Sequence, residues 1–169
     1  IIKERKEKLT DYNGDYNLYL KTAKEPMPVV TVILNNYDSF AEIYQDKYED
    51  IILALTRDGA KCGVVFVFSV TLYNSLRYRL TQNFKQKVAL QMNDENDYYN
   101  VFEKVKKKRP SHLFGRGLID EDGEVYEFQT AKICEAEEYT TKIKDQIEQI
   151  KKQKMPKAPA IPILPDKVR

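Results

Sequence analysis

The sequence predicts an α/β fold with at least two parallel strands. Two short apolar runs, at residues 28–34 (PVVTVIL) and 64–68 (VVFVF), have the composition of strands buried on both faces of a sheet. Between them, residues 39–59 place apolar side chains at helical spacing. A strand, an amphipathic helix and a second strand usually form a βαβ unit, so we expect the two strands to lie side by side.

Polar residues follow both strands at the point where each strand ends. Asn35 and Asn36 come directly after the first strand, and Ser69 follows the second. The carboxyl ends of parallel strands meet at one edge of a sheet, where α/β proteins bind ligands, so we expect these side chains to lie close together. In nucleotide-hydrolysing α/β proteins this strand carries acids that hold Mg²⁺ and orient a water molecule. An asparagine has no charge with which to hold the metal.

The elements before the second strand follow from helix-start and helix-stop signals. The chain begins with a predicted helix that ends at Asn13-Gly14, and a tyrosine-rich segment follows at residues 16–20. The helix between the strands is predicted to begin at a capping box of Ser39 and Glu42 and to end at Gly59.

Further elements are predicted after the second strand. In order, they are a short helix within residues 75–84, a strand at 87–92, a helix capped at 93–97 that Pro110 stops, a hairpin turning at Asp122-Gly123, and a helix at 135–154. Residues 155–165 contain four prolines and are predicted to form an extended linker.

The composition excludes several classes of protein. A chain of 169 residues that is 42% hydrophobic and 32% charged is typical of a soluble globular domain, and no apolar run approaches the roughly 20 residues that span a bilayer. A net charge of +2 does not indicate a nucleic-acid partner. The two cysteines, Cys62 and Cys134, lack metal-site spacing and are expected to be reduced thiols. The chain starts within a helical pattern and without methionine, so we expect it to be a fragment of a larger protein.

No catalytic residue and no metal ligand is predicted. Nothing matches the phosphate-binding pattern GxxxxGK[ST], and Gly115-Arg116-Gly117 lacks both its spacing and its lysine. Without that loop the chain is not expected to hydrolyse ATP by itself. His112 is the only histidine, and we do not expect it to pair with either cysteine as a nucleophile and base.

Several charged residues could have either a functional or a structural role. Asp38 and Glu42 could replace the missing acids, although helix capping is the simpler role. Arg77 and Arg79 could reach a ligand or a neighbouring subunit, or could form surface ion pairs. The basic run at residues 104–109 could bind phosphates, although cations are also favoured at the C-terminus of a helix.

Four stretches of the chain occur in an order that resembles a known family. They are residues 55–68 (LTRDGAKCGVVFVF), 77–94 (RYRLTQNFKQKVALQMND), 115–118 (GRGL) and 125–131 (VYEFQTA). Together, over about residues 28–131, they are similar to the carboxyl half of an FtsK/SpoIIIE-type ATPase domain. Within that family they look most like the EssC-like ATPases of type VII (Esx, WXG100) secretion systems.

The resemblance implies a RecA-like, P-loop NTPase-type, three-layer α/β core. Residues 1–154 would be a partial module that lacks its P-loop part, with a carboxyl-terminal hairpin and helix, and residues 155–169 a linker to the next module. Proteins of this kind carry several modules in tandem on the cytoplasmic side of the membrane, and this one resembles the second. The implied cofactors are ATP and Mg²⁺. The implied partners are neighbouring modules, Esx/WXG100-type substrates and further copies in a ring, but not nucleic acid.

Carried over residue by residue, the resemblance lowers the expectation of catalysis. The family's Walker B acids fall on Asn35 and Asn36, its polar sensor falls on Ser69, and Arg77 or Arg79 matches a region that can face a neighbouring module. The main hypothesis is a degenerate module with weak or no hydrolysis that serves nucleotide binding, regulation or assembly. The alternatives are an active translocase module that uses Asp38, a DNA translocase that binds through residues 104–109, and a docking module for substrate peptides.

Overall fold

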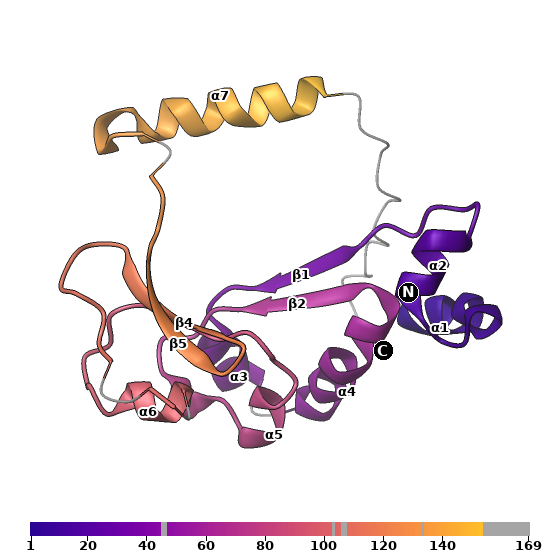
Figure 1. The fold of residues 1–169 in the computed structure, drawn as a ribbon, viewed down its shortest axis with the longest axis horizontal. Coiled ribbons are helices and arrows are strands. Elements are labelled where there is room, and N and C mark those ends of the chain that lie inside the picture. Colours follow the sequence, from indigo (N-terminus) through magenta and orange to yellow (C-terminus); the bar gives the residue numbers. More distant parts are fainter. Residues whose placement is uncertain (45–46, 103, 106–107, 133, 154–169) are drawn as a thin grey trace. The chain divides into compact units, whose positions relative to one another are not determined.

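The structure is a computed structural model of the chain (Figure 1), and it describes all residues except 45–46, 103, 106–107, 133 and 154–169. The chain divides into two compact units, Ile1–Thr130 and Ala131–Arg169. The described part of the first unit contains a parallel sheet of two strands and an antiparallel sheet of three.

Three helical segments precede the first strand: α1 (Ile2–Leu9), the 3₁₀ turn η1 (Thr10–Tyr12) and α2 (Tyr16–Thr22). The first helix stops as predicted, because Asn13 and Gly14 both have positive φ angles, of 56° and 70°. The tyrosine-rich segment is a helix, which the sequence did not predict. It begins where the Asp15 carboxylate accepts the N–H groups of Asn17 and Leu18.

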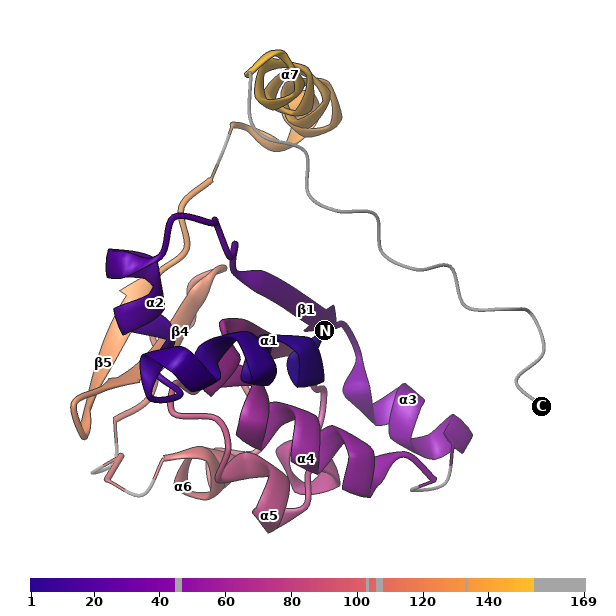
Figure 2. The ribbon, with the colours of Figure 1, turned by 90° about the vertical axis from the view of Figure 1, so that its right-hand side faces the viewer.

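Helix α1 lies against α4 and the turn η2, at the amino ends of the first two strands (Figure 2). Its buried residue Arg5 donates hydrogen bonds to three backbone carbonyls, those of Cys62 (2.9 Å), Gly63 (3.2 Å) and Pro28 (2.7 Å). One guanidinium group therefore holds together the chain segments that lead into both strands.

The strands β1 (Val30–Leu34) and β2 (Val64–Phe68) are parallel, as predicted, with Val30 opposite Val64 and Leu34 opposite Phe68. The prediction that both faces of these strands are buried is wrong for this chain. Burial alternates along each strand, and Ile33 is 68% exposed. The helices of the first unit cover only one face of the pair, so the side chains of the other face remain uncovered (Figure 1).

The segment between the strands forms α3 (Tyr37–Tyr44), α4 (Glu49–Gly59) and the turn η2 (Ala60–Cys62). The prediction of one helix from residue 39 is wrong, because α4 restarts after Tyr48, whose backbone is not helical. The reason for the earlier start is that Tyr37 is drawn into the core, where its ring stacks on Phe68 at 4.8 Å. Gly59 ends α4 as predicted.

The elements after β2 are η3 (Tyr73–Ser75), α5 (Tyr78–Thr81), β3 (Val88–Ala89), α6 (Asp97–Val101), β4 (Arg116–Glu121) and β5 (Glu124–Gln129). Strand β4 pairs antiparallel with β3 on one side and with β5 on the other. The hairpin turns at Asp122 and Gly123 as predicted, with φ angles of 51° and 80°.

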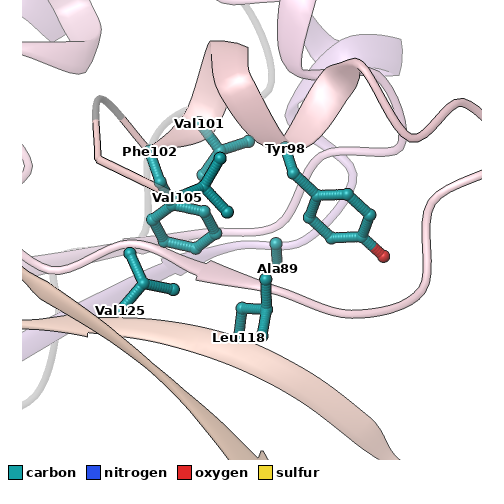
Figure 3. Close-up of a cluster of buried hydrophobic side chains, with 7 residues drawn as sticks. All are labelled: Ala89, Tyr98, Val101, Phe102, Val105, Leu118 and Val125. Atoms are coloured by element: carbon teal, nitrogen blue, oxygen red, sulfur yellow. The ribbon is translucent and has the colours of Figure 1, made fainter. Parts of the chain in front are cut away.

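Helix α6 ends at Val101, so the predicted continuation to Pro110 is wrong. Phe102 leaves the helix with extended backbone angles, and its side chain and that of Val105 are fully buried against the antiparallel sheet (Figure 3). Burial of these two side chains outweighs the weak helical preference of the segment. Residues 104, 105, 108 and 109 of the basic run therefore lie outside a helix.

The second unit contains the turn η4 (Ala136–Glu138) and the helix α7 (Tyr139–Lys152), which begins four residues later than predicted. None of the residues of α7 is buried. The predicted linker at 155–165 lies outside the described residues. Of the helices that the structure describes, none combines the length and the apolar character needed to cross a membrane.

Candidate functional site

The carboxyl ends of β1 and β2 bring three predicted site residues together. The Ser69 hydroxyl donates to the side-chain oxygen of Asn35 at 2.6 Å and accepts the backbone N–H of Asn36 at 2.8 Å. The Ser69 backbone N–H bonds to the Leu34 carbonyl at 3.0 Å, which extends the pairing of the strands by one residue. Asn35, Asn36 and Ser69 are all exposed, so this edge is open to solvent.

The conformation of Asn36 explains how the strand turns into α3. Its φ of 60° is left-handed, a conformation that asparagine tolerates better than most residues. Its side-chain amide donates to the Ser39 hydroxyl at 2.8 Å. The predicted capping box of Ser39 and Glu42 is absent from the hydrogen bonds of the described residues, because the helix begins two residues before Ser39.

Asp38 ties α3 to the loop after β2. It lies in the first turn of α3, as predicted, where a negative charge is favoured. One carboxylate oxygen accepts the Thr71 backbone N–H at 2.6 Å and the other accepts the Ser75 hydroxyl. Sequence reasoning missed both partners, because they follow Asp38 by more than 30 residues and no motif links them. Each oxygen of the carboxylate thus already accepts a hydrogen bond from the loop after β2.

The two candidate arginines differ in their surroundings. Arg77, at the start of α5, forms an ion pair of 2.7 Å with Glu49 in the first turn of α4. Arg79 is exposed on α5 and has no ion pair with a carboxylate among the described residues. The structure therefore holds Arg77 within the module and leaves Arg79 at the surface.

Two cations of the basic run at 104–109, Lys108 and Arg109, make contacts within the unit. Lys108 donates to the Val125 carbonyl and lies over the Tyr126 ring. The guanidinium of Arg109 lies 5.3 and 5.0 Å from the ring centres of Tyr98 and Tyr99. These intramolecular contacts engage Lys108 and Arg109, whereas Lys104 is exposed.

A cavity of about 380 Å³ adjoins the asparagine edge. It lies between the end of β2, the loop with η3, the segment after α5, and β3. Ser69 and Thr71 belong both to the hydrogen-bond network of the edge and to the lining of this cavity. No sequence pattern indicates this cavity, since its walls are separate segments that meet only in the fold.

The donor atoms of the edge do not fit a magnesium ion. Mg²⁺ in nucleotide sites is usually held through one or two carboxylates, but the edge offers neutral amide and hydroxyl groups, and each oxygen of Asp38 already accepts a hydrogen bond. Among the described residues, no three His, Cys, Asp or Glu side chains are grouped to hold a metal. The edge can instead donate hydrogen bonds, because the side-chain nitrogen of Asn35 has no partner within the described part of the chain.

Comparison with known proteins identifies relatives along nearly the entire chain. No protein-family model matches. The chain is 30% identical over 174 aligned residues to the type VII secretion system protein EssC of Staphylococcus aureus (strain MRSA252); the alignment covers 99% of this chain but 12% of that protein. The chain therefore spans about an eighth of the length of this curated relative.

Solved structures show the same fold. EssC (ATPases 2 and 3) from Geobacillus thermodenitrificans matches with a TM-score of 0.83 and 24% identity, over 98% of this chain and 32% of that chain. EccC (ATPases 2 and 3) from Thermomonospora curvata, in complex with a signal sequence peptide, matches with a TM-score of 0.74 and 22% identity, over 97% of this chain and 31% of that chain. The predicted P-loop NTPase-type α/β fold is confirmed.

Proposed function

We propose that this chain, an EssC-like module of the FtsK type, is a cytoplasmic ATPase-like module of a type VII secretion motor that binds nucleotide with weak or no hydrolysis. The similarity to EssC over 99% of the chain supports the secretion context. The matched structures contain ATPases 2 and 3, which supports its place as an internal module, the second in our proposal. In the longer protein it lies at the cytoplasmic face of the membrane, among neighbouring modules and Esx/WXG100-type substrates.

The observation that supports weak hydrolysis is the chemistry of the edge formed by Asn35, Asn36 and Ser69. A carboxylate can bind Mg²⁺ or accept a proton from water, whereas an amide does neither at ordinary strength. An amide N–H₂ can still donate to a phosphate oxygen, and an uncharged edge does not repel the phosphate. The exposed Asn35 amide can therefore donate a hydrogen bond to a phosphate group of the nucleotide, while the edge lacks the carboxylate that metal-dependent hydrolysis of ATP uses.

Turnover by the full-length protein tests this proposal. We expect Asn36→Ala to leave ATP turnover within about twofold of wild type, because this module contributes little of the total. Asn93→Ala is the matched control, since Asn93 is exposed and remote from the edge in sequence. A loss of tenfold or more in Asn36→Ala alone would show that the module hydrolyses ATP.

Nucleotide binding is tested separately by hydrogen exchange of the full-length protein. We expect ATP to slow exchange of the backbone amides at residues 35–39 and 69–71, and the slowing to persist when EDTA removes the metal. Absence of any ATP-dependent change at these residues would make the module a scaffold without nucleotide.

The alternative of an active module that uses Asp38 conflicts with the contacts of that carboxylate. Its oxygens accept the Thr71 N–H and the Ser75 hydroxyl, so these two contacts hold the carboxylate against the loop after β2 and compete with a water or a metal for it. Asp38→Asn in the full-length protein separates the two readings. An unchanged rate of turnover excludes the catalytic role, and abolished turnover with an intact fold would support it.

A further inference from the structure

Residues 69–76 form the loop that leads from β2 to α5, and apolar packing holds it at three points. The side chains of Val70, Tyr73 and Leu76 pack against two hydrophobic clusters, whereas Leu72 is 64% exposed. Apolar contacts are not directional. They keep the loop on the surface of the unit, but they do not orient its backbone N–H groups or its hydroxyl groups.

Asp38 supplies the directional contacts of this loop. One oxygen of its carboxylate accepts the Thr71 backbone N–H at 2.6 Å, and the other accepts the Ser75 hydroxyl. Within the described part of the chain, every hydrogen bond that residues 70–76 make with another segment goes to this carboxylate. Hydrogen bonds to an ionised acceptor are stronger than those between neutral groups, so Asp38 orients the loop.

The first residue of the loop is also the centre of the asparagine edge. The Ser69 hydroxyl donates to the side-chain oxygen of Asn35 and accepts the backbone N–H of Asn36, and the Ser69 carbonyl accepts the Tyr37 N–H at 2.9 Å. Thr71 follows Ser69 by two residues. A shift of the Thr71 backbone therefore changes the direction of the chain as it leaves the edge.

The other end of the loop leads into α5. Arg77 caps that helix and forms the ion pair with Glu49, two residues after Ser75. Leu80 of α5 is buried in the same cluster as Tyr37, the residue that precedes Asp38. The Asp38 carboxylate thus fixes a loop that has the asparagine edge at one end and α5 at the other.

We propose that Asp38 is a positioning residue for the asparagine edge. Through Thr71 and Ser75 it fixes the loop, so that the Ser69 hydroxyl keeps the Asn35 oxygen bound and the Asn35 N–H₂ group stays available to a phosphate. A site that binds by hydrogen bonds loses affinity when its donors must first be ordered. The inference rests on the proposed function, because it assigns how the nucleotide-binding groups of that site are held.

Hydrogen exchange of the full-length protein without nucleotide tests the hold on the loop. We expect Asp38→Ala to speed exchange of the Thr71 amide at least tenfold, because this N–H loses its acceptor, and to change exchange at residues 64–68 less than twofold. Asp50→Ala, which removes an acid from the first turn of α4, is the matched control and should leave Thr71 within twofold of wild type. Equal exchange of Thr71 in the two variants would overturn the proposal. Faster exchange throughout residues 64–68 would also overturn it, because Asp38 would then stabilise the whole sheet.

Substitution at Ser75 tests the same contact without removing the charge. Ser75→Ala should speed exchange of the Thr71 amide at least threefold, because the carboxylate loses one of its two partners. Ser75→Thr keeps a hydroxyl and should stay within twofold of wild type, as should the control Asn74→Ala in the same turn. In the Asp38→Ala background, Ser75→Ala should add less than a further twofold, since both contacts depend on one carboxylate. Fully additive effects of the two substitutions would contradict the proposal.

Titration with ATP tests the consequence for the asparagine edge. We expect the ATP concentration that gives half of the protection at residues 35–39 to be at least fivefold higher in Asp38→Ala than in Asp50→Ala. Equal concentrations would overturn the positioning role while the proposed function stands. Absence of ATP-dependent protection in the wild type would instead refute the proposed function, and with it a role of Asp38 toward nucleotide, so the two failures are distinguishable.

Discussion

At the scale of single residues, the Ser69 hydroxyl organises the edge because it donates to Asn35 and accepts from Asn36 at the same time. We expect Ser69→Ala to lower the free energy of unfolding by about 1 kcal/mol, since both bonds are solvent-exposed. Chemical denaturation measures the loss. Ser69→Thr keeps the hydroxyl and should restore most of it, and an alanine variant as stable as wild type would contradict the role.

Arg5 is buried in the amino-terminal region of the first unit, and its guanidinium group donates hydrogen bonds to three backbone carbonyls. Arg5→Met leaves the carbonyls of Pro28, Cys62 and Gly63 without their guanidinium donor, so we expect a loss of about 2–4 kcal/mol in the free energy of unfolding. Arg5→Lys should recover only part, because an ammonium group does not reproduce the guanidinium fork. Lys3→Met, exposed on the same helix, is the control and should stay within about 0.5 kcal/mol.

Asp58 links stability to acid pH. A hydrogen bond from Arg57, together with one from Lys6 at 2.7 Å, lowers the pKa of Asp58 to about 2. Because the folded-state pKa lies below the unfolded value, this contribution is present above about pH 4 and is lost as the pH falls toward 2. Asp58→Asn should flatten that part of the profile of melting temperature against pH. Asp50→Asn, on the same helix, is the control, and equal profiles for the two variants would refute the assignment.

At the scale of elements, helix α5 carries Arg77 at its start and Arg79 on its exposed surface, and we expect different roles for the two. Arg77→Ala removes the ion pair with Glu49 and should cost at most about 1 kcal/mol of stability, because Arg77 is largely exposed. Arg79→Ala should leave stability unchanged but lower ATP turnover of the full-length protein severalfold, if α5 faces a neighbouring module. Unchanged turnover in Arg79→Ala would remove it as an arginine that acts across an interface.

Sequence patterns predicted correctly the elements whose structure depends on neighbouring residues in the chain. The hairpin follows from Asp122-Gly123, which can adopt positive φ, and the parallel pairing follows from two apolar runs around a helix. Prediction from the sequence failed where contacts between residues far apart in the chain determine the structure. One example is Phe102, whose burial against the antiparallel sheet ends α6 early. Prediction also failed for the β1–β2 pair, because apolar runs usually mark strands buried on both faces, whereas burial alternates along these two strands.

The sequence predicted only part of the candidate site, because some of its contacts join residues far apart in the chain. Asn35, Asn36 and Ser69 could be placed at one edge because strand ends are visible in the sequence and parallel strands end together. Thr71 and Ser75, which hold Asp38, could not be found, because their contact depends on the path of a loop. Their roles toward a nucleotide remain predictions.

At the scale of the whole molecule, our proposal makes the chain part of a module rather than an independent domain. The described residues supply one helical layer, two sheets with open edges and a separate second unit. Ser69 and Thr71 take part in the hydrogen bonds of the asparagine edge and also line the cavity of about 380 Å³. A change in the shape of this cavity is therefore expected to change the geometry of the edge.

Among the described residues, β2 pairs only with β1 and β3 pairs only with β4, so one edge of each strand is without a partner strand. An unpaired strand is a template on which another chain can add a strand of its own. A polypeptide that consists of these 169 residues alone is therefore expected to self-associate through its bare strands.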